Sequence, residues 1–172
     1  MKTHNLIVNK TNLKELESFN KNFSDKVISI CPLLSKFQIH IVKHYDSQYL
    51  VETKFNPNDI FAYYLKKESI CASTIYAEII VNEDLCIKLQ LTKNELFAAI
   101  AHEIGHIIMF FHTEKEQFQG QAEEIYCDTY ACRIGLSDSL ITLLNKMIDS
   151  GLYSESIINE MHNRLFFYKS LS

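Results

Sequence analysis

Two different periods of apolar and polar residues run along this chain, and they divide it into a strand-rich middle and a helical second half. Residues 37–45 alternate between apolar and polar side chains, and residues 60–66 and 73–83 are rich in β-branched and aromatic side chains. From residue 92 onward, apolar residues recur every three or four positions, which is helical spacing. The pattern therefore predicts an α+β fold, with a small, mostly antiparallel sheet of three to four strands followed by a C-terminal helical half.

Helices are predicted on both sides of this strand region. Residues 11–36 carry apolar side chains at helical spacing, interrupted by Pro32, which indicates one or two N-terminal helices. In the second half, Gly135 and Gly151 stand where a helix would end. The helices predicted there cover residues 92–111, 121–134, 140–148 and 154–168.

The helix predicted to begin after Thr92 has the clearest start signal. Thr92 and Glu95 form a capping box, in which each side chain can bond the other residue's backbone N–H. We expect one apolar stripe along this helix and a covering element on the opposite face, where Ala98 and Ala99 precede a polar motif. The stripe consists of Phe97, Ala101, Ile104, Ile108 and Phe111.

Composition limits the possible classes of protein. The chain has 172 residues, 47% of them hydrophobic, with four Gly, two Pro and no internal repeat, so we expect one folded domain spanning residues 1–172. The net charge is −4 and no run of basic residues is present, so we expect no nucleic-acid partner. The sequence does not predict an oligomeric state.

Segments that would target the chain to a membrane or for export are not expected. No apolar run reaches ~18 residues, and the first twelve residues carry no apolar core of a secretory signal. Five scattered cysteines then indicate reduced thiols rather than a disulfide framework. We therefore predict a cytoplasmic protein without a membrane partner.

The predicted helix 92–111 contains the motif His102-Glu103-Ile104-Gly105-His106. Residues four apart lie on one face of a helix, so both imidazoles can reach one ion, and zinc is a suitable ion for them. In this motif the glutamate does not bind the metal but can take a proton from a zinc-activated water.

A catalytic zinc needs a third protein ligand, and two residues are candidates. Glu124 and Asp128 share one face of the next helix, so Glu124 can bind the ion while Asp128 orients a ligand histidine. His112 has the spacing of the metzincin motif, but Met109 replaces the glycine that would turn the chain back to the metal. We prefer Glu124, and His112 remains the alternative.

The HExxH motif followed by ExxxD resembles the gluzincins, a group of thermolysin-like zinc peptidases. The stretches ELFAAIAHEIGHII and EIYCDTYA are similar to small bacterial minigluzincin-like domains, and ImmA/IrrE-type metallopeptidases are a related possibility. The resemblance covers about residues 73–135 and implies a zincin-like fold with an active-site helix. It implies one Zn²⁺ bound by His102, His106 and Glu124, with Glu103 as catalytic base and Asp128 behind the ligands. It also implies that residues 73–83 form the sheet edge that pairs with a substrate.

Four further residues could touch this site. Glu123 is the neighbour that competes with Glu124, and Cys127 could approach the metal, although a small buried side chain is its expected role. By the same resemblance, His162 or Arg164 could stabilise the oxyanion; the alternative for both is a solvated helix face.

The predicted function is that of a zinc metallopeptidase that hydrolyses a peptide or protein substrate through a zinc-activated water and a glutamate base. A first alternative is a zinc-binding regulatory protein, or a latent enzyme whose cleft is filled by the apolar residues 165–168. A second is a metzincin-type peptidase that uses His112. A third is a structural domain that binds no metal.

Overall fold

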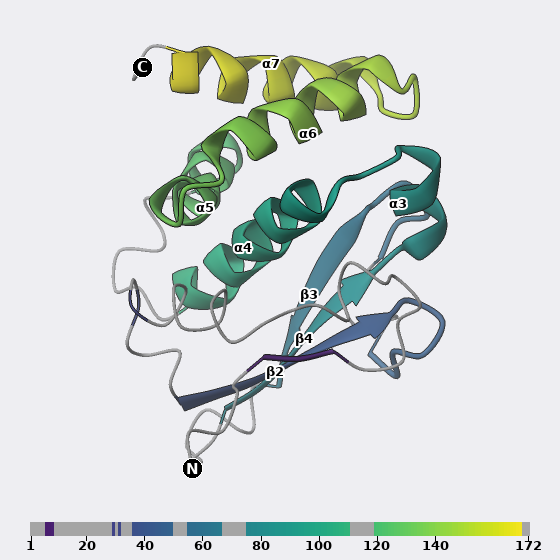
Figure 1. The fold of residues 1–172 in the computed structure, drawn as a ribbon, viewed down its shortest axis with the longest axis vertical. Helices are drawn as coiled ribbons and strands as arrows, with labels where there is room; N and C mark the ends of the chain where they lie inside the picture. Colours follow the sequence, from purple (N-terminus) through teal and green to yellow (C-terminus); the bar gives the residue numbers. More distant parts are fainter. Residues whose placement is uncertain are drawn as a thin grey trace. The chain divides into compact units, whose positions relative to one another are not determined.

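The structure is a computed structural model, and it divides the chain into two compact units, Met1–Ile87 and Lys88–Ser172 (Figure 1). The residues it describes are 6–8, 29, 31, 36–49, 55–66, 75–110 and 119–169. Most of the predicted N-terminal helical region lies outside these residues, and so does His112. The single domain predicted over residues 1–172 stays a prediction, whereas the α+β class is confirmed.

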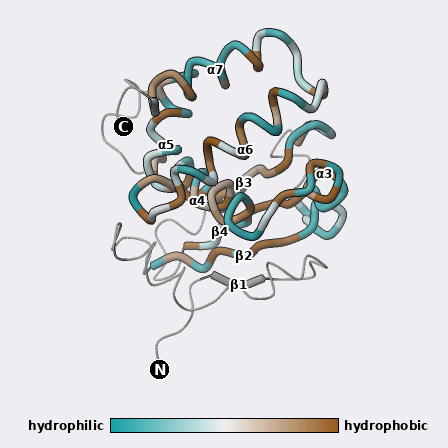
Figure 2. The backbone as a smooth tube through the Cα atoms, turned by 45° about the horizontal axis from the view of Figure 1, so that its top comes forward, coloured by the Kyte–Doolittle hydropathy of each residue, from teal (hydrophilic) through white to brown (hydrophobic). Residues whose placement is uncertain are grey.

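The first unit contains a four-stranded sheet with the strand order β1-β2-β4-β3. Figure 2 shows the hydrophobic colouring of β2 and β4 in the middle of this sheet, where Ile39, Ile41 and Ile79 are almost completely buried. The strands are β1 (Leu6–Val8), β2 (Phe37–Lys43), β3 (Phe61–Leu65) and β4 (Ile75–Val81). A short helix, α3 (Glu83–Lys88), follows β4.

Two expectations about this sheet are wrong. The sheet is mixed rather than mostly antiparallel, because β1 and β4 both run parallel to β2 and only the β3–β4 pair is antiparallel. The strand within residues 73–83 is not at the edge, since β4 pairs with β2 on one side and with β3 on the other. Its backbone bonds are therefore used within the sheet, and it cannot be the strand that pairs with a substrate.

The second unit is helical, and the four helices predicted from the sequence are confirmed. They are α4 (Lys93–Met109), α5 (Gln121–Arg133), α6 (Ser137–Asp149) and α7 (Glu155–Lys169). Gly135 and Gly151 follow α5 and α6 with positive φ angles of 83° and 69°, as the sequence suggested. Figures 1 and 2 show α7 lying along α6. Among the described residues, no helix combines the length and apolarity needed to cross a bilayer.

Helix α4 is the central helix of this unit. Of its 17 residues, 13 are buried, including Phe97, Ala101, Ile104 and Ile108 of the predicted stripe, so burial extends beyond that stripe. The covering element expected near Ala98 and Ala99 is present, because both α5 and α6 pack against α4.

Candidate metal centre

The start of helix α4 is fixed by the predicted capping box. The Glu95 backbone N–H donates to Thr92 Oγ1 over 3.3 Å, and the Thr92 N–H donates to Glu95 Oε2 over 2.6 Å. Lys146 Nζ of α6 donates to the same carboxylate oxygen over 2.8 Å, so the buried Glu95 charge is paired. This network fixes the residue at which the helix begins.

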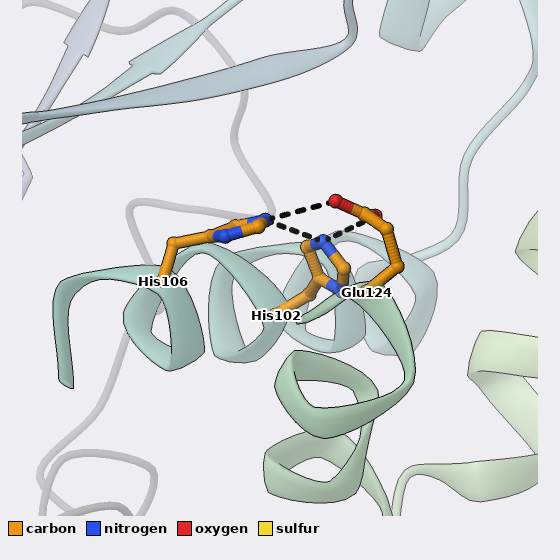
Figure 3. A group of neighbouring side chains, drawn as sticks. All are labelled: His102, His106 and Glu124. Carbon is orange, nitrogen blue, oxygen red and sulfur yellow. Dashed lines mark hydrogen bonds and ion pairs between the residues drawn. The ribbon is translucent and has the colours of Figure 1, made fainter. Parts of the chain in front are cut away.

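His102 and His106 lie side by side on α4, as their spacing predicts. Their Nε2 atoms are 3.1 Å apart, and Figure 3 shows both rings on the same side of the helix. The His102 ring is buried, and that of His106 is nearly so. The motif therefore places two imidazole nitrogen atoms close enough to bind one ion.

Helix α5 supplies the third group because it comes unusually close to α4. A Cβ atom built on Gly105 would lie 2.7 Å from the Cys127 Cα and 2.9 Å from its Cβ, so only glycine fits at this position. The close approach turns the Glu124 carboxylate toward both rings (Figure 3). Its Oε2 is 3.3 Å from His102 Nε2, and its Oε1 is 3.4 Å from His106 Nε2.

The outer side of each ring is held by a carboxylate. Asp128 Oδ1 lies 2.6 Å from His102 Nδ1, and Glu123 Oε1 lies 3.0 Å from His106 Nδ1. An ionised carboxylate only accepts hydrogen bonds, so each Nδ1 carries the hydrogen and donates it. If both rings were neutral, each would turn the lone pair of its Nε2 toward the other ring and toward Glu124. Such an arrangement of electron pairs is stable only around a positive charge, either a proton or a metal ion.

The spacing of these atoms fits a metal ion. His102, His106 and Glu124 offer ligand atoms that all lie within 4.8 Å of one another, and they form the metal-ligand group found among the described residues. Tetrahedral zinc with bonds of ~2.0–2.1 Å places its ligand atoms ~3.3 Å apart. The separations of 3.1, 3.3 and 3.4 Å come within a few tenths of an ångström of that value.

Helix α7 adds a buried cation behind the ligands. Arg164 Nε donates to Asp128 Oδ2 over 2.8 Å, and its Nη2 donates to Asp128 Oδ1 over 2.7 Å. Its Nη1 donates to Glu124 Oε2 over 3.0 Å. Arg164 is 8% exposed and Asp128 is completely buried, so this charge pair is shielded from water.

The charges of the site favour a positive group between the rings. Burial disfavours the charged imidazole, but Asp128 and Glu124 outweigh this effect and raise the pKa of His102 to about 10. Burial also opposes the charge of Glu124, yet the two rings and Arg164 hold the pKa of this carboxyl far below its usual range. The carboxylates therefore stay ionised at neutral pH, where they can hold either a proton or a metal ion on the histidine nitrogens.

The other residues suggested by the sequence have different outcomes. Glu103 is partly buried. Burial opposes the charged form of His106, but nearby carboxylates, Glu124 and Glu103 among them, outweigh this effect and raise the pKa of His106, so Glu103 is a neighbour of this ring. Cys127 is completely buried against Gly105, which fits the small packing role, and burial raises the pKa of its thiol. His162 is exposed on α7, and an oxyanion role for either His162 or Arg164 stays a prediction.

Two contributions to the site were missed from the sequence. Glu123 was considered only as a competing ligand, although it holds the ring of His106. Arg164 was considered as an oxyanion stabiliser or as part of a solvated helix face, although it is buried and bonds two carboxylates of the site. Its position in α7 between the buried Met161 and Leu165 was an available signal, since a charge on the buried face of a helix needs a partner.

Comparison of the chain with protein-family models, with curated proteins and with solved structures finds no match. The likeness to gluzincins therefore depends on the HExxH and ExxxD residues and their geometry, and any function inferred from it is a proposal.

Proposed function

We propose that this protein is a zinc-dependent peptidase of the gluzincin type. The observation that supports the proposal is the convergence of His102 Nε2, His106 Nε2 and the Glu124 carboxylate, with both outer ring nitrogens bonded to carboxylates. Two imidazole nitrogens and one carboxylate oxygen are a donor set of catalytic zinc sites, in which a fourth position stays open. A structural zinc site would instead have four protein ligands.

In this proposal the three ligand side chains bind the ion, which when bound would activate water and polarise a carbonyl group. Glu103 lies beside His102 in the sequence and takes the proton of the attacking water, then delivers it to the leaving amine. Asp128 and Glu123 keep the rings in the tautomer that presents Nε2 to the ion. The bond that breaks is a peptide bond, and its products are a carboxylate and an amine.

The test compares the wild-type protein with Glu103→Gln. Both proteins are purified without added metal, their zinc content is measured by elemental analysis, and their hydrolysis of casein is followed. We expect both to bind one zinc ion, because Glu103 is not a ligand. Turnover by the variant should fall by about 10²–10⁴-fold, because glutamine has the same shape but cannot accept the proton.

A matched control removes the same charge from an exposed position of the same unit. Glu155→Gln, in the first turn of α7, should leave both zinc content and turnover unchanged. Equal hydrolysis by Glu103→Gln and wild type would contradict the assignment of the base. Zinc binding without hydrolysis of casein by the wild type would favour the regulatory or latent alternative, and absence of zinc would end the whole proposal.

A further inference from the structure

Arg164 connects helix α7 to the candidate metal centre through three hydrogen bonds. Two of them run from Nε and Nη2 to the two oxygens of Asp128, at 2.8 and 2.7 Å, and the third runs from Nη1 to Glu124 Oε2 at 3.0 Å. One planar guanidinium group thus bonds a proposed metal ligand and the residue that orients another ligand.

These three bonds fix the orientation of both carboxylates. Asp128 Oδ1 also accepts from His102 Nδ1 over 2.6 Å, so a rotation of Asp128 would break contacts to α4 and to α7 at once. Glu124 is 26% exposed and has several rotatable bonds, so its own helix does not hold its carboxylate. The bond from Arg164 to Oε2 leaves Oε1 facing His106.

We propose that Arg164 is a positioning residue, which holds Glu124 and Asp128 in the orientation that metal binding requires. The inference rests on the proposed function, because it treats Glu124 as a ligand. It assigns to α7 a direct part in metal affinity, although α7 carries none of the three ligands.

A positioning role and a purely electrostatic role predict opposite effects on metal affinity. A positive charge beside the site repels a metal ion, so as a charge alone Arg164 would weaken binding. As a planar guanidinium group with donors in fixed positions, Arg164 orients the carboxylates of Asp128 and Glu124 before the metal ion binds, and so it strengthens metal binding. Lysine keeps the charge but is a single point donor, which makes Arg164→Lys the variant that separates the two roles.

The experiment measures zinc affinity of the full chain by competition with a chromogenic chelator, for the wild type and for Arg164→Lys. We expect the variant to bind zinc about 10–100-fold more weakly, which is the usual effect of removing a group that orients metal ligands. Both proteins are then loaded with Co²⁺, and their visible absorption spectra are compared. The bands of the variant should shift, because Glu124 no longer reaches the ion in one fixed orientation.

A matched control distinguishes positioning from a general loosening of α7. Leu165→Ala changes the next residue, which is buried in the same helix and takes no part in the hydrogen bonds of the site. It should lower the thermal midpoint of unfolding and leave zinc affinity and the Co²⁺ spectrum unchanged. A second variant, Arg164→Ala, should recover affinity when millimolar guanidinium is added, whereas methylammonium should not restore it.

The outcomes separate this inference from the proposed function. If the wild type binds zinc and Arg164→Lys binds it equally tightly with the same Co²⁺ spectrum, the positioning role is overturned and the metal site stands. If Leu165→Ala weakens binding as much as Arg164→Lys, the role of α7 is packing alone, and the inference is again overturned. If the wild type itself does not bind zinc, the proposed function fails first.

Discussion

Asp128 and Glu123 each hold the ring of one histidine, Asp128 that of His102 and Glu123 that of His106, but their exposure to water differs. The Asp128 carboxylate is completely buried and is bonded to both His102 and Arg164, whereas the side chain of Glu123 is 34% exposed. A buried, charge-assisted hydrogen bond is shorter and stronger than one that competes with water, and the distances of 2.6 and 3.0 Å agree with this. The two acids should therefore contribute unequally to the site.

We predict that Asp128→Asn weakens zinc binding by about 10–100-fold and that Glu123→Gln weakens it less. An asparagine amide can accept from His102, but its NH₂ group then faces the donors of Arg164 and leaves a buried cation without a full partner. Glu123→Gln keeps an acceptor for His106 and has water nearby. Chelator competition on the two variants checks the order, and equal losses would contradict it.

The residues proposed to bind or orient the metal were predictable only where their spacing along one helix connects them. His102, Glu103 and His106 share a short motif, and Glu124 and Asp128 are one turn apart, so spacing alone related them. Arg164 lies 36 positions from Asp128, and its contact depends on how α7 packs against α5. The position of Arg164 between Met161 and Leu165 indicates that its charge needs a partner, but no local pattern identifies that partner, so its role came from the structure.

At the level of elements, the contact between α4 and α5 at Gly105 decides whether Glu124 reaches the histidines. The backbone and Cβ of Cys127 occupy the space that a side chain on residue 105 would need. Close packing leaves helices little room to yield without moving their other contacts. The glycine in the motif is therefore needed for the distance between the helices, not for freedom of the backbone.

We predict that Gly105→Ala destabilises the protein even though alanine is the better helix former. Helix propensity alone would stabilise by ~0.5–1 kcal/mol, but forcing a methyl group into a filled contact costs ~1–3 kcal/mol. The net loss should appear as a lower denaturant midpoint, together with weaker zinc binding as Glu124 moves away. A variant more stable than wild type with unchanged zinc affinity would show that the helices are not in close contact here.

The sequence predicted individual elements better than their arrangement. The capping box and the two terminal glycines mark the helices because those signals are local. The parallel β2–β4 pairing was missed because partner and direction are set by the long connections between strands. Helix α3 was missed although the sequence carries a signal for its start, since Asn82 is followed by two acidic residues. In the structure, Asn82 Oδ1 accepts from the Leu85 N–H, as expected of a residue that caps a helix.

For the molecule as a whole, the candidate metal centre is expected to couple ion binding to both pH and folding. Without a metal, the proton on His102 stabilises the folded chain, because its pKa is about 10 there and ~6.5 in an unfolded chain. That contribution is complete below pH ~6.5 and is lost as the pH rises through about 10. A metal ion must displace this proton in order to bind.

We therefore predict that zinc uptake at pH 7–8 releases about one proton, and that apparent zinc affinity rises about tenfold per pH unit over this interval. Calorimetric titrations in two buffers of different ionisation enthalpy measure the proton count. An affinity independent of pH would contradict the raised pKa of His102.

The same ion should stabilise the whole chain. Zinc at about a thousandfold excess over its dissociation constant adds ~4 kcal/mol to the free energy of unfolding, and a chelator removes this gain. Mg²⁺ is a suitable control because it prefers octahedral oxygen ligands and should stabilise little. The thermal midpoint with and without each ion provides the measurement.

Every residue of the candidate metal centre lies in the second unit, and the two helices that carry the candidate ligands are close in sequence: 26 positions separate His102 from Asp128. Bringing such near segments together costs little chain entropy, whereas the sheet of the first unit must join strands through long crossovers. A refolding chain could thus capture its ion before the strands have found their partners. Zinc supplied at the start of refolding would then act as a nucleating template rather than as a late addition to a finished protein.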